Sequence, residues 1–123
     1  MTLFNKNTFI NQKISLDVSV NKLLAGMKNS DFLVSDENCV HRLVGLRFDP
    51  ATMQEPEIAL ICARHQMAAA KQIAFSLAKR VYPEPRLSAR LFRNYYAGQR
   101  IMEEDYRETA KIYSDYFHAM KSL

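Results

Sequence analysis

Apolar residues recur at helical spacing through most of the chain, beginning in its first third. The longest early stripe follows Ser15, a suitable N-cap, and stops before Asn29-Ser30; its members are Leu16, Val20, Leu23, Leu24 and Met27. Residues 14–20 also alternate as a strand would, and this alternative stays open. The longer stripe favours a helix. Residues 1–13 show no sustained period, and we expect them to form an arm that docks through its aromatic side chains.

The segment 40–48 has two interpretations. Val40, Leu43 and Val44 suit a helix that starts after Ser35-Asp36-Glu37, whereas residues 43–48, which end in Leu46-Arg47-Phe48, also suit a short strand. Asp49-Pro50 then breaks regular structure, because the residue before a proline is pushed away from helical angles. The pattern leaves helix and strand open here.

The second half predicts two long helices. Over 56–82, one stripe runs without a glycine or proline inside it, and Pro56 suits the first helical position; the stripe consists of Leu60, Ala63, Met67, Ala70, Ala74, Leu77 and Val81. After Pro83-Glu84-Pro85, the apolar phase continues to about Lys121, which favours one long helix kinked at Gly98 over two helices split there. We therefore predict an all-α or nearly all-α fold: a single domain, residues 1–123, of four to five helices with a long C-terminal helix.

Composition agrees with one globular unit. The 123 residues are 48% hydrophobic and 24% charged, which is ordinary globular balance. No apolar run approaches the roughly 20 residues that a bilayer-spanning helix needs, and the first residues lack a signal-peptide pattern. We expect a cytoplasmic protein with no membrane partner, in which Cys39 and Cys62 stay reduced.

Charge is unevenly distributed along the chain. The formal net charge is +4, but residues 64–102 hold eight basic groups against the single acid Glu84. In a continuous C-terminal helix, four arginines would share one face, namely Arg86, Arg90, Arg93 and Arg100. Lys71, Lys79 and Arg80 on the preceding helix would extend this basic patch. Guanidinium groups bind phosphates with two hydrogen bonds. The pattern predicts a non-enzymatic nucleic-acid-binding regulatory or accessory protein, DNA-binding or RNA-binding. The alternative is an adapter or chaperone whose basic face docks an acidic protein partner.

Aromatic residues crowd the C-terminal segment, with more surface than one alanine-rich neighbour would cover. Tyrosine and arginine are enriched at protein interfaces. We therefore predict a dimer, or an assembly with a second protein, through Tyr95, Tyr106, Tyr113, Tyr116 and Phe117.

The candidate chemical groups are two pairs, Cys39 with His41 and Cys62 with His65. A zinc site would need both pairs to meet, and the Cys-x-His spacing is not a usual zinc pattern. No glycine-rich phosphate loop or nucleophile motif is present in the sequence. The prediction is therefore no metal, no cofactor and no catalytic residue, with an enzyme that uses Cys62 or His65 as the alternative.

Overall fold

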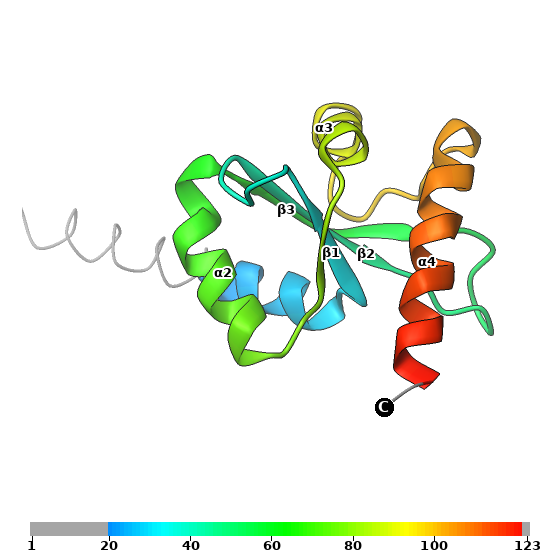
Figure 1. Cartoon of the computed structure of the whole chain (residues 1–123), viewed down its shortest axis with the longest axis horizontal. Helices are drawn as coiled ribbons and strands as arrows, with labels where there is room; N and C mark the ends of the chain where they lie inside the picture. Colours follow the sequence, from blue (N-terminus) through cyan, green and yellow to red (C-terminus); the bar gives the residue numbers. More distant parts are fainter. Residues whose placement is uncertain (1–19, 122–123) are drawn as a thin grey trace, which may run out of the picture.

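The computed structural model describes residues 20–121 and shows a mixed β-sheet with helices on both faces (Figure 1). The strands, in the order β3-β2-β1-β4 across the sheet, are β1 (Phe32–Ser35), β2 (Arg42–Arg47), β3 (Glu57–Ala63) and β4 (Val81–Pro83). The β1–β2 and β2–β3 pairs are antiparallel, and β4 runs parallel to β1. The all-α prediction is therefore wrong, and the fold is α/β.

One face of the sheet packs against α3 (Pro85–Asn94) and α4 (Tyr106–Lys121). Phe32, Val34 and Val44 from the strands meet Leu87 and Leu91 from α3 and the buried side of α4 in one apolar cluster. Phe32 is fully buried, and its ring lies 4.6 Å from the ring of Tyr113 in an edge-to-face arrangement. This cluster fixes where α4 lies.

The opposite face packs against the helical residues 20–29 and α2 (Met67–Ser76), which Figure 1 shows on the other side of the sheet from α3 and α4. Leu23 and Met27 meet Leu60 and Cys62 there. The predicted helix ending at Asn29-Ser30 is therefore present in its described part. Gly26 permits close packing, because a Cβ atom at that position would come within 2.8 Å of Leu60 Cδ1.

The predicted helix over 56–82 is wrong. The segment instead contains β3, a one-turn 3-10 helix η1 (Arg64–Gln66), α2 and β4. Ile58, Leu60 and Cys62 are buried at every second position, which is the strand period. The apolar positions of this segment fit both the helical and the strand period, and antiparallel pairing with β2 selects the strand. Pro56 therefore precedes a strand.

Residues 42–47 form β2, so the strand alternative was the right one for this segment. The helix alternative fails because Asp36 organises a tight loop after β1. Its carboxylate accepts hydrogen bonds from the backbone N–H groups of Val40, His41 and Arg42, at 3.0–3.2 Å. Cys39 in this loop has a φ of 54°, so the chain reverses there instead of coiling.

The predicted long C-terminal helix is also wrong, because residues 95–102 form a strap between α3 and α4. Gly98 has a φ of 93°, which favours glycine, and its N–H donates to the Ile58 carbonyl at 2.7 Å. The Ile58 N–H donates to the Gln99 carbonyl at 2.8 Å, so the strap pairs with the outer edge of β3. The turn η2 (Glu103–Asp105) then leads into α4.

The expected arm over 1–13 lies outside the described residues, as does the strand alternative for 14–20 except at Val20, which is helical. Within 20–121, no helix combines the length and the apolar character that crossing a bilayer requires.

Candidate functional site

The four arginines of the predicted basic face do not share one helix. Arg86, Arg90 and Arg93 lie on α3. Arg100 lies in the strap, and its backbone forms an isolated antiparallel β-bridge with Glu57 of β3. Arg100 Nη1 contacts Glu55 Oε1 at 3.3 Å. The continuous face that the helical period predicted is therefore interrupted.

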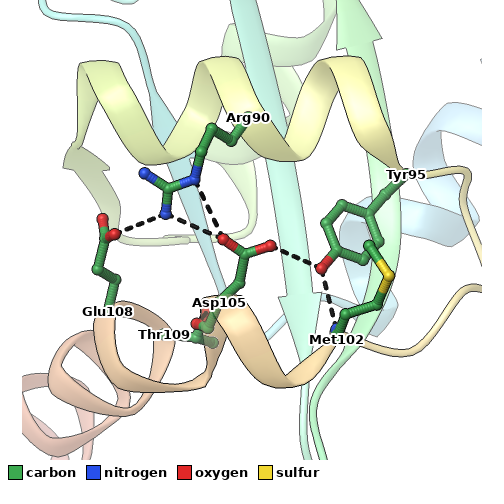
Figure 2. Close-up of polar contacts among 6 residues, drawn as sticks. All are labelled: Arg90, Tyr95, Met102, Asp105, Glu108 and Thr109. Atoms are coloured by element: carbon green, nitrogen blue, oxygen red, sulfur yellow. Dashed lines mark hydrogen bonds and ion pairs between the residues drawn. The ribbon is translucent and has the colours of Figure 1, made fainter.

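Arg90 belongs to a polar clamp that we define by Arg90, Tyr95, Asp105 and Glu108 (Figure 2). Its Nε and Nη2 atoms donate to Asp105 Oδ1 at 3.1 and 3.0 Å, and Nη2 also donates to Glu108 Oε1 at 2.6 Å. The hydrogen bond to Glu108 raises the pKa of Arg90, against an opposing effect of burial. The guanidinium thus holds α3 to the start of α4 and is not available as a free phosphate ligand.

Tyr95 forms the other half of the clamp. Its hydroxyl donates to Asp105 Oδ2 at 2.7 Å and accepts the Met102 N–H at 2.9 Å. Burial, together with the Asp105 carboxylate, raises the pKa of Tyr95 to about 12. Asp105 is only 3% exposed, so its carboxylate depends on the three hydrogen bonds that it accepts, two from Arg90 and one from Tyr95.

The other predicted phosphate contacts are scattered over the fold. Lys79 Nζ donates to the Ser30 carbonyl at 2.6 Å. Lys71 is exposed on α2, on the other face of the sheet from the exposed Arg86 and Arg93 of α3. Arg80 lies at the edge of the sheet, close enough to Tyr116 of α4 for its charge to oppose the rise in the pKa of that tyrosine.

A groove of about 420 Å³ lies between the β2–β3 connection and α4. Aromatic side chains, Pro56 and small residues of α4 line it; the groove is defined by Phe48, Gln54, Glu55, Pro56, Tyr106, Ala110, Tyr113, Ser114 and Phe117. Phe117 is 39% exposed and Tyr106 is 41% exposed, so apolar surface remains open to solvent at this site.

Polar contacts beneath the groove hold its wall in place. Asp31 Oδ2 accepts hydrogen bonds from the Tyr113 hydroxyl at 2.8 Å and from the Phe48 N–H at 2.7 Å. Burial raises the pKa of Tyr113 well above its usual range, and the neighbouring Asp31 carboxylate adds to the effect. The phenol therefore stays neutral and fixes the aromatic wall.

The five predicted interface aromatics divide into two groups. Tyr95 and Tyr113 are 3% and 4% exposed and belong to the core, and Tyr116 is partly buried against it. Tyr106 and Phe117 are the two that reach the surface, and both line the groove. The predicted dimer itself stays a prediction.

Sequence reasoning missed Ala110 and Ser114, which line the groove. They are one turn apart on α4 and lie between the larger Tyr106 and Phe117. Small residues flanked by aromatics on an exposed helix face were the available signal. The other wall comes from residues 48 and 56, and only the tertiary fold brings those beside α4.

The cysteine and histidine pairs form no site in the described part of the chain. Among residues 20–121, no three His, Cys, Asp or Glu side chains are grouped to hold a metal. Cys62 is fully buried in the core beneath α2, and burial raises the pKa of its thiol to about 12. A nucleophilic thiol needs the opposite, an exposed group with a lowered pKa.

Comparisons with known proteins identify a fold. No family model matches the chain, and no curated protein matches it. The cytoplasmic domain of FlhB from Shewanella putrefaciens superposes with a TM-score of 0.71 at 17% identity, over 80% of this chain and 74% of that one. An EscU C-terminal domain with an asparagine-to-aspartate substitution gives 0.70 at 19%, over 76% and 98%. A proline-to-alanine variant gives 0.66 at 19%, over 72% and 86%.

These likenesses correct the functional prediction. The chain has the α/β fold of the EscU and FlhB domains, so the prediction of a nucleic-acid-binding helical regulator is wrong. Arg90 and Arg100, which were to contact phosphates, are paired with carboxylates. The fold itself is that of the C-terminal domains of EscU and the cytoplasmic domain of FlhB.

Proposed function

We propose that this chain is an export-apparatus domain that binds a segment of a protein partner in the groove beside α4. EscU and FlhB are export-apparatus proteins of type III secretion. The observation that carries the proposal is the superposition on the FlhB cytoplasmic domain at a TM-score of 0.71 over 80% of this chain. A cytoplasmic location, as for the FlhB domain, is part of the proposal.

The groove suits an apolar anchor of a protein segment. Its volume falls within the roughly 300–1,000 Å³ of typical ligand pockets. The aromatic rings of Phe48 and Tyr113 meet edge to face at 5.7 Å, which leaves a firm wall for one or two inserted side chains. Because the polar atoms under the groove already have partners, recognition there rests on apolar burial, as at interface hot spots.

The proposed role is binding and not classical catalysis. The EscU and FlhB domains are known for autocleavage and secretion switching. The buried Cys62 with its raised thiol pKa gives no support to the enzyme alternative. The acidic-partner alternative would place binding on cations elsewhere, so it predicts a different contact surface from the groove.

Photo-crosslinking in the cell that encodes this chain tests the proposal. The probe p-benzoylphenylalanine replaces Tyr106 in the groove, and in a matched control it replaces Tyr96, which is 82% exposed and does not line the groove. We expect the groove probe to crosslink a secreted protein or another export-apparatus protein, identified by mass spectrometry. Ala110→Glu, which puts a charge into the groove lining, should remove that product, whereas Lys111→Glu beside it should not.

Two outcomes would contradict the proposal. The first is a groove probe that yields only the products of the Tyr96 probe, which would remove the groove as a specific site. The second is a specific groove product, lost in Ala110→Glu, that belongs to no secretion system; it would keep the groove and overturn the export assignment.

A further inference from the structure

The helical residues 20–29 and the segment 64–79, which contains η1 and α2, form a layer whose charged residues are all basic. We call it the basic layer. It contains no Asp or Glu, and its five cations are Lys22, Lys28, Arg64, Lys71 and Lys79. The two segments lie together on one face of the sheet (Figure 1), and Lys79 Nζ links them through the carbonyls of Ser30 and Lys28. Segments far apart in the sequence thus combine into one positive surface.

None of the ion pairs among residues 20–121 involves a cation of the basic layer. The other layer contains charges of both signs: Arg90 and Arg100 on that side are paired with acids, whereas Arg86 and Arg93 of α3 are in none of the ion pairs among the described residues. A merely solvated helix face usually mixes signs, because opposite charges one turn apart stabilise it. A surface of one sign instead attracts a partner of the opposite sign.

Phe75 adds a second, independent feature to the basic layer. Its side chain is 89% exposed on α2, whereas Phe32 in the core is fully buried. Lys71 lies one turn before it on the same exposed side of the helix. Ala68, also exposed, continues that side with a small residue, so no bulky polar side chain of α2 at these positions shields the ring.

We infer that the basic layer is a membrane-docking surface, on which the cations bind anionic phospholipid headgroups and Phe75 enters the interface between them. An exposed aromatic ring one turn from a lysine, on a layer whose charged residues are all basic, matches the composition of interfacial membrane-binding helices. An acidic protein surface would neutralise the cations, but it would offer the exposed Phe75 ring no apolar environment. A lipid surface satisfies both features at once.

This inference does not depend on the export proposal. The basic layer and the groove lie on opposite sides of the sheet, so one surface can be occupied while the other stays open. Each cation near an anionic surface contributes about fivefold in affinity, so the five together suffice for reversible binding even if only some reach the lipid.

A single-tryptophan reporter tests the orientation. The chain has no tryptophan, so Phe75→Trp creates one fluorophore at the proposed insertion point. With the full chain, we expect a blue-shifted emission on vesicles of equal parts phosphatidylglycerol and phosphatidylcholine, and quenching by brominated lipid. Phosphatidylcholine vesicles alone should give no shift. The control Tyr96→Trp, 82% exposed in the strap, should show no shift on either vesicle.

Cosedimentation with the same vesicles measures the affinity. Lys71→Glu should weaken binding at least about fivefold and Phe75→Ser about tenfold, whereas Lys111→Glu on α4 should leave it within twofold. Both positions of the basic layer are exposed, so circular dichroism should confirm an unchanged fold. Glycerol phosphate at matched phosphate concentration should not compete, which distinguishes a lipid surface from a free phosphate.

Three results would overturn the inference. The first is that the protein does not bind the anionic vesicles at low salt. The second is an equal loss of binding in Lys71→Glu and Lys111→Glu. The third is that soluble polyglutamate shifts the emission of the Phe75→Trp variant and the vesicles do not. The last result would identify an acidic protein as the partner of the basic layer.

Discussion

Replacing Asp105 by alanine is the sharpest test of how the clamp holds α3 to α4. The carboxylate is 3% exposed and accepts three hydrogen bonds, two from Arg90 and one from Tyr95. In Asp105→Ala, Arg90 Nε and the Tyr95 hydroxyl both lose their acceptor in a site from which water is largely excluded. The fold should therefore lose stability through unsatisfied donors as well as through the lost ion pair.

The expected size follows from the exposure of the two partners. Removing one partner of a fully buried pair costs about 3–5 kcal/mol. The Arg90 side chain is 32% exposed and keeps its contact with Glu108, so solvent and the second acid screen part of that loss. We expect the free energy of unfolding to fall by about 2–3 kcal/mol.

Urea denaturation followed by circular dichroism measures this change, and the m value should stay constant. Glu108→Ala is the matched control, because Glu108 contacts the same guanidinium but is 50% exposed. It should cost no more than about 0.5 kcal/mol. In the Asp105→Ala background, Tyr95→Phe should cost less than in the unmodified chain, because only the hydrogen bond from the Met102 N–H is then left to lose.

A loss below about 0.5 kcal/mol in Asp105→Ala would refute the reasoning, because it would mean that the buried acceptor contributes no more than a surface pair. Strict additivity of Asp105→Ala and Tyr95→Phe would refute the clamp as a coupled unit.

Three further predictions address other parts of the fold. A thiol reagent should modify about one cysteine per folded chain, the half-buried Cys39, and both in denaturant, because Cys62 is buried and its pKa is raised to about 12; fast labelling of both would be the contrary result. The pKa of Tyr95 is raised to about 12 from about 10 in the unfolded chain, so the folded state favours the neutral phenol. The stabilisation from this phenol is complete below about pH 10 and is lost as the pH rises through 12. Urea titrations should show a smaller alkaline loss of stability in Tyr95→Phe than in the unmodified chain. Gly45→Ala would drive a Cβ atom into the side chain of Ser30 and should cost about 1–3 kcal/mol, a figure that an unchanged urea midpoint would contradict.

Sequence patterns predicted some elements because their signals were local. The helical stripe ending near Asn29-Ser30 and the start of a helix at Pro85 both agree with the structure, as expected where a stop signal or a proline at the first helical position marks an end. The α4 stripe was also recognised, although its start was placed too early. These elements are amphipathic over at least two turns, so the helical period is well defined.

The errors arose where the deciding partner is distant in sequence. Ile58, Leu60 and Cys62 satisfy the strand period, but Leu60 and Ala63 also fit the helical stripe that continues into α2, and only pairing with β2 selects the strand. The strap at Gly98 forms because Ile58 offers it an unpaired strand edge. The groove could not be predicted, since its two walls are 50 or more residues apart in the chain.

The charge pattern was read correctly in sign and wrongly in space. The basic run that starts at Arg64 continues, through the fold, into Lys22 and Lys28 and not into Arg90 and Arg100. The latter two lie in the layer that holds Glu55, Asp105 and Glu108, and these acids neutralise them. Within residues 20–121, the sheet therefore separates the basic layer, whose cations form no ion pair there, from a layer that contains charges of both signs and an apolar groove. Because the two surfaces differ in chemistry, a membrane and a protein segment can be bound at the same time without competing.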